Sequence, residues 1–378
     1  MIYQFNTDFV PDLTVPEIFK VRGKNWVSFG QDNLYPQYIT ELYNKSAINR
    51  TSLISKQLNV VGEGLETIDE QYNYVLNRAN DMEGWNDVFD KCALDYEIFG
   101  GFALNVIWTR DGERIHSFYH IPFQDVRSGD YDIAEDKVTH YYYSSDWKNF
   151  RKHKPVAYPT FDPNIADEHP NQILYYYDYQ PGSKYYPLPS YSGSCSDIEI
   201  DVQVSTLHLS NLENGLNPSL WINFRNGIPD PDMQQQLYQE IASNFSGVEA
   251  TGRFFATFSD SAETSPEITP IESANDEYYV NLENRITTRI LTGHRITSPL
   301  LLGLYHEGGG GLGSNKDEIL TAHMHFTRTV IQPDQKAMLK PFNRLMHYHG
   351  YNTALKIQPL ALFPEDKTGE VEETEAMK

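Results

Sequence analysis

The sequence predicts a mixed α+β fold, and three observations support that prediction. Between Trp85 and Ile121 an amphipathic helix is followed by two strands. Residues 216–271 form a second, smaller set of strands around one helix. Between Glu283 and Pro341 two helices flank a break that is rich in glycine. A chain of 378 residues with 40 % hydrophobic residues is long enough to bury a core.

The first block has the clearest pattern. Apolar side chains recur there every three or four residues, at Trp85, Val88, Phe89, Cys92, Ala93 and Tyr96. This spacing predicts a helix with one buried face that ends at Gly100-Gly101. Two strands, Phe102–Trp108 and Ile115–Ile121, should then form a hairpin around Asp111-Gly112. Further strands are expected at Val138–Tyr143 and Ile173–Asp178.

Helices are predicted before this block, and an exposed segment is predicted after it. Residues 1–30 are expected to be irregular, with helices at Asn33–Tyr43, Ser46–Leu58 and Glu66–Asn80. The segment 147–170 is basic and interrupted by prolines, which favours a solvated excursion over the alternative of a partner contact.

Residues 191–214 are ambiguous. Ile198, Ile200, Val202, Val204 and Thr206 alternate as in a strand, but part of the same set also fits one helix face. Because four of these residues are β-branched aliphatics, local propensity favours the strand.

The smaller block is predicted to hold strands at Gly215–Phe224, Gly252–Phe258 and Ile268–Ile271. Its helix should start at Asp230-Pro231 and run to Phe245. The block separates the ambiguous segment from a helix at Ser273–Gly293. If those two elements run antiparallel, the block lies at the tip of a hairpin.

The third block cannot be one continuous helix. Gly293, Pro299 and the glycines from Gly308 to Gly313 each disfavour helix. The expected product is a mobile loop with few side chains. It is no triphosphate-binding loop, because Lys316 precedes Asp317 rather than a hydroxyl residue, and the segment before it is helical.

After the loop, a long helix from Lys316 is expected to bend at Pro333 and continue towards Met346. A closing strand at Ala354–Phe363 should follow it. The acidic tail from Pro364 is expected to be disordered.

Composition restricts the function. The formal charge of −22 argues against a protein that grips nucleic acid by its phosphates, although not against one that surrounds DNA and repels it. Cys92 and Cys195 fit no metal or redox spacing, so a reducing compartment is expected. No apolar run approaches membrane-spanning length and Met1–Phe5 does not open a signal peptide, which predicts a soluble, intracellular protein without membrane contact.

Tyrosines and histidines leave two alternatives open. The 26 tyrosines, several of them in runs, are expected to fill sheet faces and subunit contacts, with sugar or base stacking as the alternative. Histidines gather near the loop at His294, His306, His323, His325, His347 and His349. His323 and His325 would point about 200° apart on a helix, so they do not form a zinc motif. We therefore predict no catalytic residue, cofactor or metal, and polar positions facing a channel or a neighbour.

An ordered set of segments resembles the portal proteins of tailed double-stranded-DNA phages. The set comprises Gly227–Pro229, Asn244–Gly247, Ala250–Arg253, the helix Tyr278–Leu291, His294–Gly303 and the Trp85–Ile121 block. It covers roughly residues 30–345. No single segment is diagnostic, but their order is specific.

The resemblance implies a portal-type fold with named regions. The wing would be 1–190, with 346–363 as its closing strand. The stem helices would be 191–214 and 272–296, the clip 215–271, the tunnel loop 297–315 and the long kinked helix 316–345, followed by the tail 364–378. Because only about 30 residues follow Met346, the helical crown of this family should be minimal or absent.

The resemblance also implies site residues. The DNA-facing tunnel loop would comprise Ser298, Tyr305, His306, Glu307, Gly308, Gly309, Gly310, Gly311, Leu312, Gly313, Ser314 and Asn315. The clip would contact the motor and neck through Trp221, Phe224, Arg225, Asn226, Gln236, Glu240 and Asn244. The stem would present Glu272, Asp276, Glu277, Arg285 and Arg289.

The function implied is structural. Twelve copies would form a ring at one capsid vertex of the virion, assembled in the host bacterial cytoplasm, and double-stranded DNA would pass through its channel during packaging and ejection. The partners implied are the terminase large subunit, neck or adaptor proteins, and the major capsid and scaffold proteins. The alternatives are another phage structural or carbohydrate-binding protein, or a metal- or nucleotide-dependent enzyme.

Overall fold

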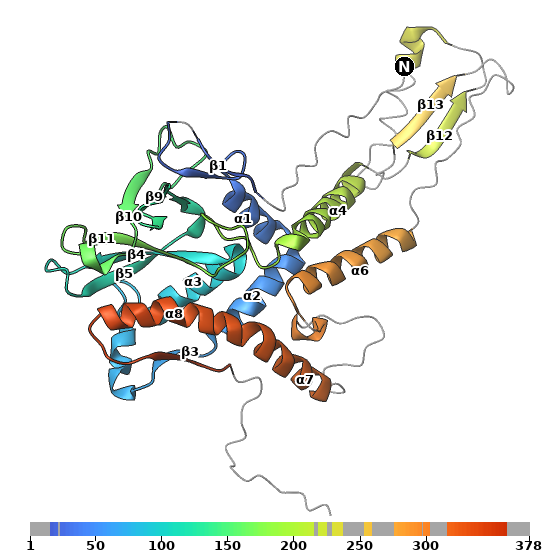
Figure 1. Ribbon diagram of the computed structural model, residues 1–378. Helices are drawn as coiled ribbons and strands as arrows, with labels where there is room; N and C mark the ends of the chain where they lie inside the picture. The colour runs from blue at the N-terminus through green and yellow to red at the C-terminus, as the bar shows by residue number, and fades with distance from the viewer. Residues whose placement is uncertain are drawn as a thin grey trace, which may run out of the picture. The chain divides into compact units, whose positions relative to one another are not determined.

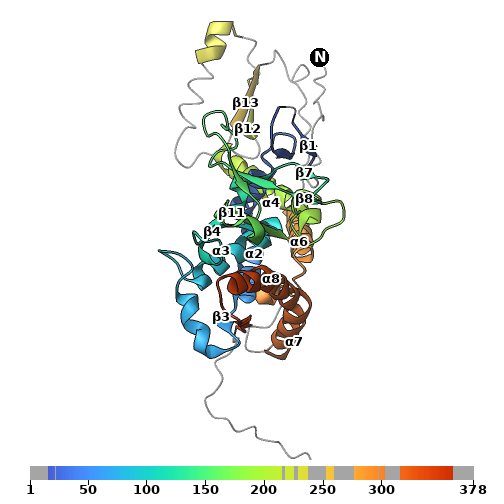
Figure 2. The same cartoon turned by 60° about the vertical axis from the view of Figure 1, so that its left-hand side comes forward.

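The computed structural model describes residues 16–21, 23–214, 218–224, 229–236, 253–258, 276–296, 298–302 and 316–360. The chain divides into two units. Unit 1 comprises Met1–Ser196 and Arg289–Lys378, and unit 2 comprises Asp197–Thr288. Both contain helices and strands, as the sequence predicted (Figures 1 and 2).

The central sheet of unit 1 has three antiparallel strands in the order β11-β4-β5. The predicted hairpin is confirmed as β4 (Gly101–Trp108) and β5 (Ile115–Ile121), and β11 (Asn171–Tyr177) pairs with the other edge of β4. Gly112 turns the hairpin with a φ of 70°, a conformation that glycine adopts without strain.

Helix α3 (Trp85–Phe99) matches the predicted helix. Its first turn is fixed by the Asp87 carboxylate, which accepts a hydrogen bond from the Gly84 N–H. It ends at Gly100, where φ is 82° and a Cβ would lie 2.5 Å from the Leu188 carbonyl oxygen. Only glycine satisfies both conditions, which is why the helix stops there.

The core lies where α3, the central sheet and α8 (Gln332–Tyr348) meet. Aromatic rings dominate it: Trp85 packs edge-on against Phe118 at 4.8 Å, and Phe89 against Phe342 at 4.9 Å between ring centroids. In Figure 1, α8 lies alongside α3 below the sheet. The Phe342 contacts therefore tie the C-terminal part of unit 1 to its N-terminal part.

Two more predicted helices are confirmed, and one is right only in part. Helix α1 covers Tyr35–Lys45, and α2 covers Ala47–Val61 with Ser46 as its N-cap. The predicted helix at 66–80 is replaced by β3 (Gly64–Thr67) and a 3-10 helix at Glu70–Asn77. Strand β14 (Leu355–Gln358) pairs with β3, which is a partner that local sequence cannot reveal.

Short strands complete unit 1. A second antiparallel sheet has the order β10-β9-β6, from Val156–Pro159, His140–Tyr143 and Val126–Ser128. The predicted excursion at 147–170 is therefore wrong in part, because β10 belongs to this sheet. The expectation that 1–30 is irregular is wrong in part, since β1 and β2 pair there, and residues 1–15 lie outside the described residues. The remaining elements are β1 (Ile18–Lys20), β2 (Val27–Phe29), β7 (Tyr131–Asp132), β8 (Lys137–Val138) and 3-10 helices at Phe123–Asp125, Pro163–Ile165 and Ser192–Ser194.

Unit 2 contains a parallel pair, β12 (Pro218–Phe224) and β13 (Arg253–Phe258), as two of its three predicted strands. Residues 231–236 are helical, and the Asp230 carboxylate caps them by accepting from the Met233 N–H at 2.9 Å. The strand predicted at 268–271 and the rest of the predicted helix lie outside the described residues.

Two helices cross the boundaries in the chain between the units. Helix α4 covers Cys195–Asn214 and α6 covers Asp276–Gly293. The strand that local propensity favoured at 198–206 is therefore wrong, and the helix implied by the portal resemblance is present. Within unit 2, His208 Nε2 on α4 lies 3.8 Å from Glu283 Oε1 on α6.

The long C-terminal helix is interrupted by a π-helical segment. Helix α7 (Lys316–Phe326) runs into π-helical residues Thr327–Ile331 and then into α8. Pro333 occupies the first turn of α8, directly after the π segment, and it has no N–H to donate to a carbonyl of that segment. The helix is therefore irregular at the π segment, directly before the proline where the sequence predicted a bend.

Candidate functional site: the root of the glycine-rich loop

In the sequence, the glycine-rich segment follows a short apolar anchor that belongs to unit 1. A 3-10 helix at Pro299–Leu302 follows α6, and Leu301 and Leu302 pack against the core. The Ser298 hydroxyl accepts a hydrogen bond from the Leu300 N–H at 3.3 Å and so starts this turn. We call residues 294–302 the loop root.

Arg295 connects the loop root to the π segment. Its φ of 59° lies in the left-handed region, which turns the chain sharply after α6. Its Nη2 donates to the Thr329 carbonyl oxygen at 2.9 Å. The loop root and the π segment are thereby joined through a side chain within unit 1.

His294 is a buried structural residue. It is 1 % exposed, its ring lies 4.5 Å from that of Tyr191, and its Nε2 lies 2.8 Å from Asn49 Oδ1. Burial lowers its pKa to about 3, and the charge of Lys56 adds to the effect. The ring is therefore neutral at physiological pH and donates from Nε2 to Asn49.

A buried ion pair lies beside this histidine. Lys56 of α2 and Glu97 of α3 form a salt bridge with side chains only 3 % and 1 % exposed. Asp334 of α8 completes the group: burial and the nearby Glu97 raise its pKa to about 7, against the opposing charges of Lys56 and Arg295. Three helices and the loop root thus converge on one polar cluster.

Sequence reasoning missed this cluster, although a signal was present. Lys56 falls on the apolar face of α2, in the spacing of Asn49, Leu53 and Val60, all of which are buried. A lysine at such a position requires a buried partner, because an unpaired charge in a core is costly. The partner itself could not be named without the fold.

Few of the predicted site residues are described with their side chains. Ser298 is half-buried at the loop root, Gln236 is exposed on the helical stretch of unit 2, and Arg285 and Arg289 are exposed on α6. Only the backbone is described for Trp221 and Phe224 on β12 and for Asp276 and Glu277 on α6. Residues Tyr305 to Asn315, Arg225, Asn226, Glu240, Asn244 and Glu272 lie outside the described residues.

Several tyrosines pack in the core and on sheet faces of unit 1, which is part of what the sequence predicted. Tyr141 stacks on Tyr175 at 4.7 Å, and Tyr186 stacks on Phe29 at 4.0 Å. Tyr141, Tyr186 and Tyr191 are all buried. Sheet and core packing therefore accounts for these tyrosines.

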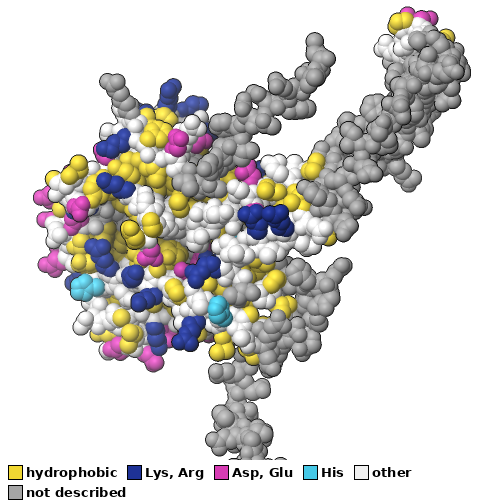
Figure 3. Space-filling model, turned by 45° about the vertical axis from the view of Figure 1, so that its right-hand side comes forward, with side chains coloured by type: hydrophobic (Ala, Val, Ile, Leu, Met, Phe, Trp, Pro, Cys, Tyr) yellow, Lys and Arg dark blue, Asp and Glu magenta, His cyan; other side chains and the backbone are white. Residues whose placement is uncertain are grey.

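The described side chains give little support to a metal site or a nucleic-acid grip. Among them, no group of three or more His, Cys, Asp and Glu is placed to hold a metal ion. Lys and Arg are spread over the face drawn in Figure 3 rather than gathered in one patch. Among the helices of the described ranges, none combines the length and hydropathy needed to cross a membrane.

Comparison with known proteins finds similarity to a phage protein and to structures of a gene transfer agent particle. No protein-family model matches the chain. It is 25 % identical over 191 residues to the probable portal protein of Haemophilus phage HP1 (strain HP1c1). That match takes in 45 % of this chain and 54 % of the phage protein, so the chain aligns with about half the length of this curated relative.

Solved structures agree on the fold. A chain in the neck of the native gene transfer agent particle, computed with C12 symmetry, superposes with a TM-score of 0.56 at 14 % identity, covering 85 % of this chain and 84 % of that one. A chain in the neck of the empty particle, computed with C6 symmetry, gives a TM-score of 0.57 at 15 % identity with the same coverage. The resemblance to phage portal proteins predicted from the sequence is thus confirmed, in sequence by a phage portal relative and in fold by a particle neck.

Proposed function

We propose that this chain is the subunit of a portal ring at one capsid vertex, through whose channel double-stranded DNA enters and leaves the particle. The observation that carries the proposal is the fold match over 85 % of the chain to a component of a particle neck computed with C12 symmetry. The phage relative named as a probable portal protein supports the same role.

Exposed apolar side chains on the helices α4 and α6 support a ring. Ile200, Leu207 and Leu209 on α4 are 42 %, 44 % and 57 % exposed, and Val280 on α6 is 55 % exposed. Several apolar side chains exposed on helices of one small unit are typical of a surface that another subunit covers. In the proposed ring these helices are the stem, and neighbouring copies cover them.

The loop root supports the proposed tunnel loop. Both sides of the glycine run connect to buried structure, through Leu301 and Leu302 before it and through α7 and the π segment after it. A glycine-rich segment between two fixed ends can approach a duplex closely and yield as the duplex moves. Because the chain carries a formal charge of −22, a channel built from it would not bind the DNA phosphates tightly, so the DNA can keep moving.

The finer parts of the proposal follow the portal architecture. The wing, stem and clip take the residue ranges predicted above, and the clip meets the terminase motor during packaging and neck proteins afterwards. Capsid and scaffold proteins surround the wing, and the ring has twelve copies. No catalytic step is assigned to the chain.

Negative-stain microscopy of the purified protein tests the ring. We expect annular particles with a central hole. As a matched pair, Leu207→Glu with Leu209→Glu should weaken the ring by placing charges in the stem contact, whereas Met82→Glu should not, because Met82 is 90 % exposed in unit 1. Monomers or trimeric fibres at high protein concentration would contradict the proposal.

Charge reversal in the stem tests the channel. Changing Glu272, Asp276 and Glu277 to lysine should slow DNA passage in a packaging assay, because each new cation attracts phosphates that must be released again. The same three positions changed to glutamine serve as the control for lost charge alone. Unchanged packaging by the lysine variant would remove these residues from the channel wall.

A further inference from the structure

A groove on unit 1 runs along one face of the long C-terminal helix. Two hollows, of about 550 Å³ and about 450 Å³, share Gln332 and Gln335 in their linings, so together they form one groove. Its other wall consists of β14 and the two residues that follow it, Pro359 and Leu360. We call it the α8 groove.

The helix lines the groove with a regular stripe of residues. They come in adjacent pairs every four positions, from His323 and Met324 to Leu339 and Lys340, and the stripe ends at Asn343. Residues four apart lie on the same side of a helix. At about 1.5 Å per residue the stripe extends over about 30 Å of the helix axis. An extended peptide of about eight residues, at about 3.3 Å each, spans nearly the same length.

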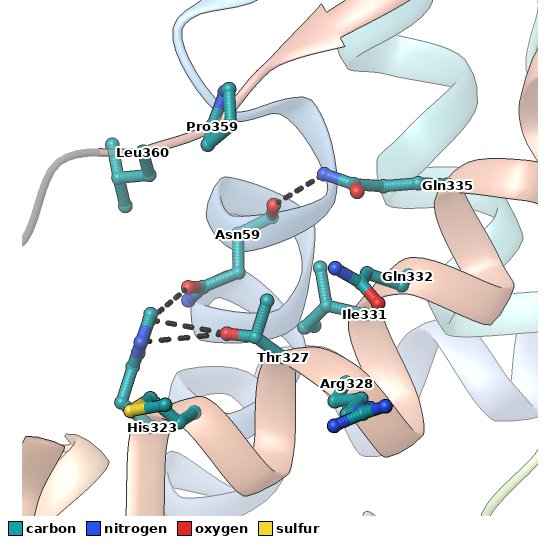
Figure 4. Close-up of a pocket in the computed structure, with 10 residues that line it drawn as sticks. Asn59, His323, Thr327, Arg328, Ile331, Gln332, Gln335, Pro359 and Leu360 are labelled. Carbon is teal, nitrogen blue, oxygen red and sulfur yellow. Dashed lines mark hydrogen bonds between the residues drawn. The ribbon is translucent and has the colours of Figure 1, made fainter. Parts of the chain in front are cut away.

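Hydrogen bonds fix both ends of the groove. His323 Nε2 lies 3.1 Å from Asn59 Oδ1, and Gln335 Nε2 donates to the Asn59 carbonyl oxygen at 3.2 Å. Figure 4 shows these side chains meeting at Asn59, near the end of α2. At the other end, Asn343 Oδ1 accepts from the Leu355 N–H at 2.6 Å. The groove is therefore preformed rather than a gap between loose side chains.

The groove is cationic, although the chain has 52 acidic and only 30 basic residues. Arg328, Lys336, Lys340 and Lys356 line it, and no Asp or Glu occurs in its described lining. Lys340 and Lys356 each form one ion pair with a partly exposed carboxylate outside the lining. Exposed pairs of this kind are weak, so both lysines can exchange partners. Charge complementarity therefore favours an acidic ligand.

Aliphatic side chains lie among the cations. Met324 is 70 % exposed and Leu360 is 40 % exposed, and Leu339 and Ile357 are half-buried in the lining. A ligand with apolar side chains would cover them. The described lining holds no Phe, Tyr or Trp on which a base could stack. These features favour a peptide over a nucleic acid.

The β14 wall presents an open strand edge. Strand β14 pairs only with β3, so within the described residues its other edge is unpaired. The Ile68 N–H donates to the Ala354 carbonyl oxygen at 2.8 Å, and in an antiparallel pair such bonds involve every second residue. The backbone of Leu355 and Ile357 therefore faces the open edge. Asn343 binds the first of these N–H groups, which leaves Ile357 able to pair with a further strand.

We propose that the α8 groove docks an extended acidic segment of another protein. The segment adds a strand beside Ile357, places carboxylates next to Arg328 and Lys336, and covers Met324 and Leu339 with aliphatic side chains. Alternate side chains of a strand point to opposite faces, so alternating acidic and aliphatic residues suit this lining. The inference does not depend on the portal role, because it rests on contacts within unit 1 and ring formation is measured separately.

Fluorescence anisotropy with the purified full chain tests the docking. The probe is a labelled peptide, Leu-Asp-Val-Glu-Leu-Asp-Val-Glu, in which acidic and aliphatic side chains alternate. We expect saturable binding that weakens as the salt concentration rises. The same peptide with Asn and Gln in place of Asp and Glu should bind at least about tenfold more weakly. N-methylation of alternate residues, which blocks strand pairing, should have a similar effect.

A pair of matched variants locates the binding in the groove. Arg328→Glu with Lys336→Glu should weaken binding at least about tenfold, because two attractive charges become repulsive. Arg151→Glu with Lys152→Glu makes the same change of charge at two exposed residues outside the groove and should change the affinity by less than about twofold. A thermal melt shows that both variants keep their fold.

Three results would overturn the proposal. If the peptide does not bind, or if both variants weaken its binding equally, the groove does not dock an acidic segment. If a DNA oligonucleotide of equal charge displaces the peptide and binds more tightly, the groove is a nucleic-acid site. If the peptide binds only after dilution of the protein, or only to a chain shortened after Leu360, a second copy or this chain itself fills the groove.

Discussion

Replacing Lys56 by methionine isolates the buried ion pair between α2 and α3. Methionine keeps the length of the side chain but removes the charge, so Glu97 remains charged with a side chain only 1 % exposed. Among the described residues, its Oε1 has no hydrogen-bond partner, so the loss of Lys56 also removes the partner of the other carboxylate oxygen. Breaking a buried pair in this way costs about 3–5 kcal/mol.

Thermal unfolding measures that cost. At about 2 °C per kcal/mol for a large domain, Lys56→Met should lower the Tm by on the order of 6–10 °C. Adding Glu97→Leu to the same chain should recover most of the loss, because no uncompensated charge then remains.

A second pair provides the control. Lys45 and Glu41 form an ion pair with both side chains 56 % exposed, so Lys45→Met should shift the Tm by less than about 1 °C. If Lys56→Met shifts the Tm no more than Lys45→Met, the convergence of α2, α3 and α8 on a dry polar cluster is refuted.

Three further perturbations address the joint and the loop. The added methyl group of Gly293→Ala would overlap Ser194 Oγ and lie 2.7 Å from Ser194 Cβ, so this change should lower the free energy of unfolding by about 1–3 kcal/mol in a denaturant melt. Adding Ser194→Gly should restore the loss. As the control, Gly193→Ala meets nothing within 4 Å and should leave the free energy of unfolding unchanged. The pKa of Asp334 is raised from 3.8 to about 7, so the folded protein loses stability as the pH rises from about 4 to 7 and this carboxyl ionises. The Tm of Asp334→Asn minus that of the natural chain should therefore increase between pH 4 and pH 7 and stay constant above pH 7. A Tm difference that does not depend on pH would contradict the buried carboxyl. Deleting Gly308 to Gly313 should leave rings intact in micrographs while impairing DNA packaging or retention, and failure to assemble would instead make the loop part of the structural core.

Local patterns were sufficient where contacts are local. The face of α3, its end at Gly100 and the β4–β5 hairpin were all predicted, because helix periodicity, a left-handed glycine and an Asp-Gly turn act within a few residues. The portal resemblance also predicted the helix α4 where β-branched alternation favoured a strand. That helix buries Ile198 completely, while several of its other apolar residues are exposed within the chain.

Distant pairing explains most of the errors. Strand β3 forms by pairing with β14, almost 300 residues later, so the start of the helix predicted at 66–80 is a strand instead, because of a partner that no local window contains. Strand β10 likewise joins β9 despite its flanking prolines. At the site, the lysine on the buried face of α2 was visible in the sequence, but its partners on α3 and α8 became identifiable only through the fold.

The π-helical turn at Thr327–Ile331 determines which faces of α7 and α8 lie on the same side of the long C-terminal helix. A single residue advances an α-helix by about 100°. Removing Thr329 would let α7 and α8 join as one regular helix, at the cost of swinging the buried Phe326 away from its present facing by about that angle. The extra residue in the π-helical turn therefore sets the rotation of α7 about the helix axis relative to α8.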